Sequence, residues 1–194
     1  FTIPIPSGLT PQNMPRISPD GRIIAFAAKD SLERTMIWVR PLNSLTANPL
    51  PGTEDAGTPF WSPDGRYLGF IAGGKLKRIP VSGGPADVIC DAPSGSDGTW
   101  SRDGVILYDG ASADPIYRVN AAGGVPSVAV SGDSLNQISW PAFLPDAKPF
   151  FYTRPPPTGG QPPVGTPAQT GGPARPEAGA RVGDPAGRGR AVRV

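Results

Sequence analysis

The 194-residue chain contains no histidine and a single cysteine, Cys90. Without histidine there is no Ser-His-Asp triad, no Cys-His pair and no histidine ligand for zinc. One thiol cannot form an intramolecular disulfide or a cysteine-based metal cluster. Because Cys90 lies in the apolar stretch Asp-Val-Ile-Cys, we interpret it as a small buried hydrophobic side chain. The sequence therefore predicts no catalytic site, no metal site and no cofactor.

Long hydrophobic segments and a strong net charge are lacking as well. No stretch approaches the ~18 consecutive apolar residues of a transmembrane helix, so we expect no membrane contact by this segment. A formal net charge of only +2 gives no reason to expect a nucleic-acid partner. The chain starts at Phe1 without a basic and apolar leader. We expect it to be an interior piece of a longer protein.

Glycine and proline, by contrast, are abundant, and they are concentrated at one end. Residues 154–194 contain nine Pro, nine Gly, six Ala and six Arg, and no aromatic residue, Leu, Ile or Lys. Such a segment cannot bury enough apolar surface to offset its chain entropy, and we predict that it is disordered. It interrupts a repeat just after Thr153, and its common residues have the codons richest in G and C. A shifted reading frame is our hypothesis for it, and a true linker is the alternative.

A short turn motif recurs through the rest of the chain. Residues 18–22, Ser-Pro-Asp-Gly-Arg, return unchanged at 62–66, and weaker copies occur at 100–104 and 143–147. Proline presets the turn, aspartate tolerates its next position, and glycine then takes a left-handed conformation. Four-stranded propeller blades repeat every ~40–50 residues, which matches this spacing. We assign structural turn roles to Asp20, Gly21, Asp64, Gly65, Asp103, Gly104 and Asp146.

Each repeat also contains short strand-like segments. In the second repeat these are residues 58–62, 66–72, 75–81 and 86–90, separated by Gly- and Pro-containing turns, which is the pattern of an antiparallel meander. Residues 23–28 show no polar alternation, which indicates a strand buried on both faces. The sequence thus predicts an all-β, incomplete propeller over residues 1–153. Its blades span about 14–50, 58–91 and 97–131, with a partial blade at 139–153 and residues 1–5 belonging to a further blade. Such an open arc is expected to be marginally stable and to self-associate, because its edges are unpaired.

These turns, together with the aliphatic and aromatic strands after them, resemble the TolB-like, WD-like propeller repeats of bacteria. Residues 49–152 are similar to one subgroup, through Pro59-Phe60-Trp61-Ser62-Pro63-Asp64, Gly98-Thr99-Trp100 and Pro141-Ala142-Phe143-Leu144-Pro145-Asp146. That subgroup is the extracytoplasmic propeller located after the kinase domain and membrane helix of many bacterial serine/threonine protein kinases. The resemblance implies a non-catalytic module outside the cytoplasm that senses a ligand or binds a protein or peptide, with the remaining blades supplied by the parent chain.

The kinase and hydrolase motifs themselves are absent from this sequence, so we do not expect it to be an enzyme. Two alternatives remain open. One is the propeller of a serine peptidase of the prolyl-oligopeptidase type, which would require a Gly-x-Ser-x-Gly segment downstream. The other is a periplasmic TolB-like envelope component.

Few residues suggest a binding site. Three tryptophans on the predicted innermost strands could stack a ligand at the channel mouth, or could pack between blades: Trp61, Trp100 and Trp140. The four repeated aspartates could be imagined as a calcium ring, but bracing their own turns is the favoured role. The cationic residues of the strands are interpreted as solvated strand ends rather than a binding patch: Arg40, Lys75, Lys77 and Arg78. The Gly73-Gly74 pair is interpreted as a hairpin turn.

Overall fold

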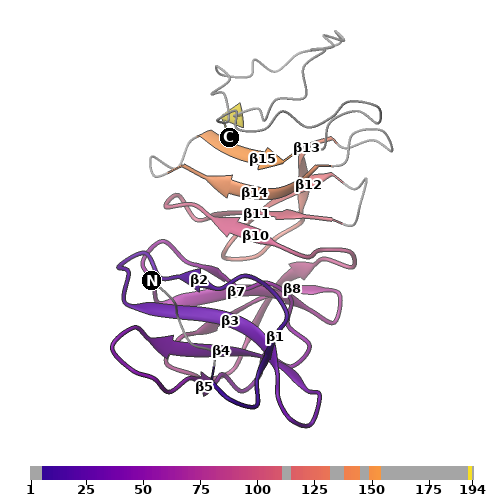
Figure 1. Ribbon diagram of the computed structural model, residues 1–194. Coiled ribbons are helices and arrows are strands. Elements are labelled where there is room, and N and C mark those ends of the chain that lie inside the picture. The colour runs from indigo at the N-terminus through magenta and orange to yellow at the C-terminus, as the bar shows by residue number, and fades with distance from the viewer. Residues whose placement is uncertain (1–5, 111–114, 132–137, 145–148, 154–191, 194) are drawn as a thin grey trace, which may run out of the picture.

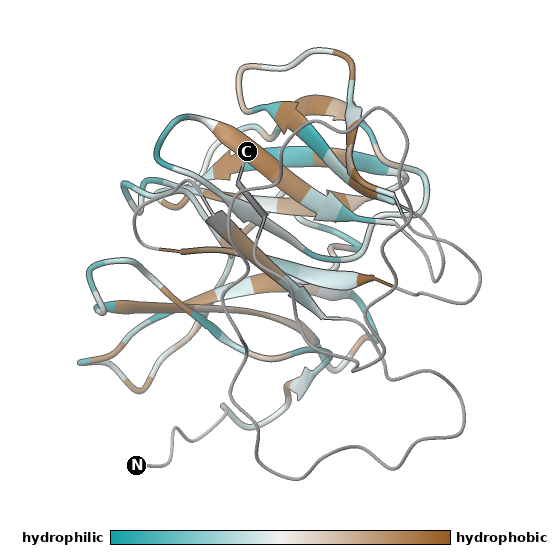
Figure 2. Ribbon diagram, turned by 90° about the horizontal axis from the view of Figure 1, so that it is seen from above, coloured by the Kyte–Doolittle hydropathy of each residue, from teal (hydrophilic) through white to brown (hydrophobic). Residues whose placement is uncertain are grey.

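The computed structural model describes residues 6–110, 115–131, 138–144, 149–153 and 192–193, and every regular element within these ranges is a β-strand (Figure 1). The strands form four separate antiparallel sheets that succeed one another along the chain. Figure 1 shows the sheets stacked in chain order, and Figure 2 shows that hydrophobic residues are concentrated on the strands. The prediction of an all-β propeller arrangement is confirmed.

The first sheet has a divided innermost strand. β1 (Thr10–Pro11) and β2 (Arg16–Ile17) both pair with β3 (Ile23–Lys29), at its end and near its start respectively. β4 (Thr35–Pro41) and β5 (Asn48–Pro49) complete the sheet. The sheet therefore begins at Thr10, four residues before the expected start of the blade.

The second and third sheets are regular four-stranded meanders. The second consists of β6 (Phe60–Trp61), β7 (Tyr67–Ala72), β8 (Lys75–Pro80) and β9 (Asp87–Asp91). The third consists of β10 (Gly98–Trp100), β11 (Val105–Asp109), β12 (Ile116–Asn120) and β13 (Ser127–Val130).

The fourth sheet has three strands: β14 (Ser139–Phe143), β15 (Pro149–Thr153) and β16 (Val192–Arg193). β16 comes from the segment expected to be disordered, and it pairs with β15, whose edge offers unpaired backbone groups. The rest of that segment, residues 1–5 of the expected further blade, and Asp146 lie outside the described residues.

The sheets are held together by apolar side chains on both faces. Successive residues of β7 point to opposite faces, so Leu68 and Phe70 pack toward the first sheet, while Ile71 packs toward the third. Leu107 and Ile116 of the third sheet pack against Phe150 of the fourth. Full burial of a side chain such as Phe70 (0% exposed) contributes roughly 1.5–3 kcal/mol. Burial on both faces explains why these strands lack apolar–polar alternation.

The contact between the second and third sheets depends on two glycines. A Cβ on Gly69 would lie 2.3 Å from the Phe60 ring, and one on Gly98 would lie 2.7 Å from the same ring. The Phe60 side chain is 4% exposed. The ring therefore fills a slot that exists only because both neighbours lack side chains.

Hydrogen bonds between neighbouring sheets use side chains. The Trp61 indole donates to the Arg16 carbonyl (2.9 Å), and the Arg78 guanidinium donates to the Ala121 carbonyl (3.1 Å). The Phe143 amide donates to the Thr99 hydroxyl (3.3 Å). The backbone ladders, in contrast, remain within each sheet.

The repeated turns join the first strand of a sheet to the second. In the first turn the Ser18 hydroxyl donates to the Asp20 carboxylate (2.5 Å) and accepts from the Ile23 amide (2.9 Å). Ser62, Asp64 and Tyr67 repeat these bonds at 2.6 and 2.9 Å. These serine hydroxyls are the first cause of the lowered pKa of both aspartates.

The third turn is built differently. The Ser101 hydroxyl accepts from the Val105 amide (3.1 Å), while Asp103 is exposed. Left-handed glycines occupy the same place in all three turns, with φ of 72°, 69° and 74° at Gly21, Gly65 and Gly104.

Candidate ligand-binding site

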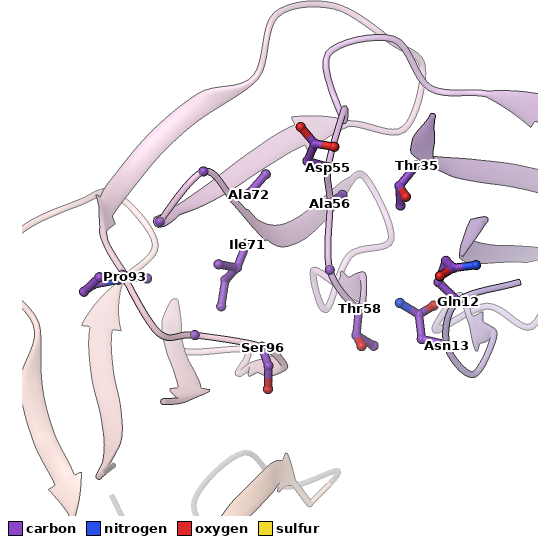
Figure 3. A pocket seen from close by; sticks show the side chains of 15 residues that line it. Gln12, Asn13, Thr35, Asp55, Ala56, Thr58, Ile71, Ala72, Pro93 and Ser96 are labelled. Carbon is purple, nitrogen blue, oxygen red and sulfur yellow. The ribbon is translucent and has the colours of Figure 1, made fainter. Parts of the chain in front are cut away.

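A pocket lies at the end of the sheets opposite the repeated turns. Strands alternate in direction, so the hairpin between the second and third strands and the loops between sheets meet at this end. The pocket has a volume of about 540 Å³, within the range of about 300–1,000 Å³ typical of ligand sites. It lies beside the first and second sheets and is lined by the loop between them and by the loop that leads to the third sheet (Figure 3). Its lining comprises Gln12, Asn13, Thr35, Asp55, Ala56, Gly57, Thr58, Ile71, Ala72, Gly73, Gly74, Ala92, Pro93, Gly95 and Ser96.

One wall of the pocket is the loop between the first and second sheets, which is fixed by a buried threonine. Thr53 is 0% exposed, and its hydroxyl accepts from the Ile37 amide (2.9 Å) and donates to the Leu50 carbonyl (2.5 Å). Beyond it, the Asp55 amide donates to the Thr35 carbonyl (3.0 Å). Asp55 has a φ of 56°, in the left-handed region that aspartate tolerates better than most residues. The loop thus fixes the backbone of Asp55 on the wall and leaves its carboxylate exposed.

A hairpin turn and two amide side chains complete the wall. Gly73 and Gly74 both have positive φ (59° and 70°), as a two-residue turn of this kind requires. The side-chain oxygen of Asn13 accepts from the Ala27 backbone amide (3.1 Å), and the side-chain NH₂ of Gln12 donates to the Thr10 backbone carbonyl (3.0 Å). These bonds orient Asn13 with its NH₂ group, and Gln12 with its oxygen, still available to a ligand.

Ser96, on the opposite side of the pocket, is fixed by a buried carboxylate. Asp109 is 1% exposed, and one of its oxygens accepts from the Ser96 hydroxyl (2.9 Å) and the Asp97 amide (2.8 Å). Its other oxygen accepts from the Trp140 amide (3.1 Å). A carboxylate can be buried in this way because both oxygens are hydrogen-bonded. Asp109 therefore links the pocket rim to the first strand of the fourth sheet.

A second buried carboxylate lies beside the first. Asp97 is 4% exposed and pairs with the Arg16 guanidinium from the first sheet at 2.5 Å, while the Gly98 amide donates to its other oxygen (2.7 Å). Burial raises the pKa of Asp97 to about 6, since desolvation outweighs the opposing effect of Arg16. The pair ties the inner strand of the first sheet to the third sheet, across the second.

The three predicted tryptophans do not form one site. Trp61 and Trp100 occupy matching places, opposite Leu68 and Ile106, and pack in the buried clusters between sheets. Phe143, opposite Phe150, has the same place in the fourth sheet.

Trp140 lies three residues earlier, where the β14–β15 register shifts. It has a φ of 54°, and it is 63% exposed. Of the three tryptophans, it is the one that presents most of its side chain to solvent.

The cationic strand residues are mostly engaged in pairs. Lys75 pairs with Asp91 (2.6 Å), and Arg78 pairs with Asp87 (3.3 Å) while lying 5.5 Å from the centre of the Tyr67 ring. Arg40 is only 5% exposed, with its Nε donating to the Ser44 carbonyl (2.8 Å), so its interpretation as a solvated strand end is wrong. Its guanidinium is buried because the chain after β4 folds back over it. Lys77 is half-buried.

Cys90 is 7% exposed and part of the cluster between the second and third sheets. Burial raises the pKa of its thiol, so the buried hydrophobic role expected for it holds. Within the described ranges no three acidic or thiol side chains are grouped as metal ligands, and the same ranges contain no helix with the length and hydrophobicity to cross a membrane.

The residues that fix the pocket were not predicted from the sequence. Asp55, Asp97 and Asp109 lie outside the repeated motif, in connections or at a strand end. The sequence contains one signal for them. Asp109 directly follows the apolar run Val-Ile-Leu-Tyr, and a carboxylate at the end of a buried strand is expected to accept hydrogen bonds.

No protein-family model and no curated protein sequence matches this chain. Solved structures do. A putative TolB from Agrobacterium tumefaciens is 19% identical with a TM-score of 0.57, and the match covers 71% of this chain and 52% of the TolB chain. TolB from Acinetobacter baumannii is 20% identical with a TM-score of 0.60, covering 76% and 38% respectively.

The β-propeller domain of the trilobed protease from Pyrococcus furiosus is 13% identical with a TM-score of 0.53, covering 77% of this chain and 49% of its own. The described chain thus spans about half or less of each of these structures. At such identities the similarity establishes the fold, and the chain is an array of β-propeller blades.

Proposed function

We propose that this chain is a non-catalytic binding module that holds a protein or peptide segment in the pocket formed by its first two sheets and the loop that leads to the third. The observation that carries the proposal is the construction of the pocket. Two sheets and the loop leading to the third contribute to it, its loop wall is fixed by the buried Thr53, and its far rim is fixed by the buried Asp109. A site held this firmly needs little reorganisation when a ligand binds.

The residues available to a ligand suit a peptide. The free NH₂ of Asn13 and the oxygen of Gln12 can pair with a peptide carbonyl and a peptide amide respectively. Ile71 and Pro93 add apolar contact area. A convergence of a few polar groups over an apolar floor is the usual form of a ligand site.

The parent architecture that we propose is the extracytoplasmic sensory part of a bacterial serine/threonine protein kinase. It is supported by the resemblance of residues 49–152 to such propellers. Kinase motifs and a membrane helix encoded upstream in the same gene would support this architecture, and an upstream region without them would refute it.

The binding proposal is tested with a panel of capped tripeptides titrated into the full isotope-labelled chain and monitored by amide chemical shifts. We expect the shifts to occur at pocket residues such as Gly57, Gly73 and Ser96. Thr58→Trp, which fills the pocket, should abolish them, whereas Gly104→Ala at a distant turn should leave them unchanged. Shifts elsewhere on the molecule, or shifts that survive Thr58→Trp, would refute the proposal.

A peptidase propeller is the second candidate, favoured by the likeness to the trilobed protease propeller and to the acylaminoacyl peptidase of Pyrococcus horikoshii, the latter 14% identical with a TM-score of 0.54. The two candidates differ in the domain that the parent gene encodes downstream of the propeller. A hydrolase domain with a Gly-x-Ser-x-Gly segment there would select the peptidase.

A further inference from the structure

The charge of the pocket comes from one residue. Among the lining residues that the structure describes, Asp55 carries the only carboxylate, and none is a lysine or arginine. Among the described residues none forms an ion pair or hydrogen bond with the Asp55 side chain. The other polar groups of the lining are neutral amides, hydroxyls and backbone groups. A ligand in the pocket therefore meets one uncompensated negative charge.

The position of that charge is fixed by the backbone. The Asp55 amide is bonded to the Thr35 carbonyl (3.0 Å), and the Gly57 amide is bonded to the Ile71 carbonyl (2.9 Å), so the residues on both sides of Ala56 are anchored to neighbouring strands. Gly57 also has no room for a side chain without crowding, because a Cβ there would lie 3.2 Å from the Ser96 carbonyl. Figure 3 shows Asp55, Ala56 and Thr58 in succession along this wall, with Pro93 and Ser96 across from them. The loop backbone that carries Asp55 therefore needs no ligand to order it.

We propose that the pocket selects a peptide segment with a basic side chain, whose ammonium or guanidinium group pairs with the Asp55 carboxylate. This inference rests on the proposed function and adds the charge of the ligand to it. The peptide backbone is held by the side-chain amides of Gln12 and Asn13, and an acidic side chain is disfavoured by repulsion from Asp55. Because Asp55 is exposed, the pairing contributes modestly to affinity and mainly to selection.

The neighbouring residue provides a matched control. Glu54 is also an exposed carboxylate of the same loop, but it does not line the pocket, and it accepts a hydrogen bond from the Gly52 amide (3.1 Å). Backbone hydrogen bonds lower its pKa. Glu54→Gln and Asp55→Asn remove the same charge one residue apart. Asparagine tolerates the left-handed conformation of Asp55, so the fold is expected to survive both changes.

The experiment compares three capped tripeptides, Gly-Lys-Gly, Gly-Gln-Gly and Gly-Glu-Gly, titrated into the full chain at low salt and monitored by amide shifts. In the wild type the lysine peptide should bind about fivefold more tightly than the glutamine peptide. Asp55→Asn should abolish that preference while glutamine-peptide binding persists, and Glu54→Gln should retain it. Added salt should reduce the preference.

Each alternative outcome is decisive. Equal binding of the lysine and glutamine peptides in the pocket would overturn the charge selection and leave the proposed function standing. A preference that survives Asp55→Asn would overturn the role of Asp55. Failure of all three peptides to shift the pocket residues would overturn both proposals together.

Discussion

The two ends of the blades are built in contrasting ways. At the end with the repeated turns, serine and aspartate bond to backbone and side chains only two to five positions away. At the pocket end, hydrogen bonds and an ion pair join residues as far apart as 31 and 81 positions, with Asp97 and Asp109 buried. The first end is repeated in the sequence and the second is not. The repeat therefore specifies the scaffold, and the residues outside the repeat specify the pocket.

The strongest test of this contrast is the removal of the carboxylate that organises the pocket end. Asp109→Ala leaves the Ser96 hydroxyl and the Asp97 and Trp140 amides without their acceptor, and each buried unsatisfied group costs about 1–3 kcal/mol. We expect the free energy of unfolding to fall by about 4 kcal/mol, measured by urea denaturation. The free energy of unfolding should fall clearly less in Asp109→Asn, because asparagine keeps one acceptor oxygen. Equal losses in the two variants would mean that hydrogen bonding is not what holds this end together.

The two ends should also respond oppositely to pH. Asp20 and Asp64 have lowered pKa values, so their stabilisation is present above the ordinary pKa of 3.8 and is lost as the pH falls below it. Asp97 has a pKa raised to about 6, so the folded state binds its proton more tightly than the unfolded state does. Its contribution is greatest at low pH and decreases as the pH rises from 3.8 to about 6.

A pKa difference of about 2 units corresponds to about 3 kcal/mol. The wild type should therefore lose up to about 3 kcal/mol of unfolding free energy between pH 4 and pH 7 that Asp97→Asn does not lose. Urea denaturation of both proteins at the two pH values measures this difference. Parallel pH profiles for the two proteins would contradict the assignment of this titration to Asp97.

The interior between the two ends depends on the slot around the Phe60 ring. Gly98→Ala would place a Cβ 2.7 Å from that ring and 3.0 Å from the Leu107 carbonyl. Overpacking of this kind costs about 1–3 kcal/mol, and we expect about 2 kcal/mol in chemical denaturation. A double mutant with Phe60→Leu should recover part of the loss, since the smaller side chain relieves the ring contact. Simple additivity of the two single-mutant effects would argue against the slot.

The smallest effect is expected at the repeated turns. Gly65→Ala meets only an ordinary contact, 3.6 Å from Pro19, so its cost is the left-handed conformation alone, about 1 kcal/mol. Thermal unfolding should show the loss, and peptide binding at the pocket should be unchanged. A turn variant that abolished peptide binding at preserved stability would break the division between scaffold and site.

The scaffold could be predicted from the sequence because its determinants are local. Proline, aspartate and glycine at 63–65 act on their own backbone, and the lack of alternation at 23–28 reports burial directly. The pocket could not be predicted, because Arg16 and Asp97 meet only once three sheets are stacked, and neither residue type reveals its partner. Trp140 shows that a shared residue type is a weaker guide than the repeat. The repeated turn aligns Phe143 with Trp100, and Phe143 does lie opposite Phe150, whereas Trp140 lies three residues earlier, where the β14–β15 register shifts.

Trp61, Arg78 and Thr99 form hydrogen bonds between neighbouring sheets through their side chains, whereas the backbone hydrogen bonds of each strand stay within its own sheet. This arrangement affects how such arrays can change during evolution. Apart from the Arg16–Asp97 pair, which joins the first and third sheets, a chain joined in this way behaves approximately as a row of units, each with its own stability and one coupling to each neighbour. Duplicating or deleting a whole unit then alters two couplings and leaves every backbone ladder intact. Propellers can thus gain or lose blades by genetic rearrangement without any single step that destroys a sheet.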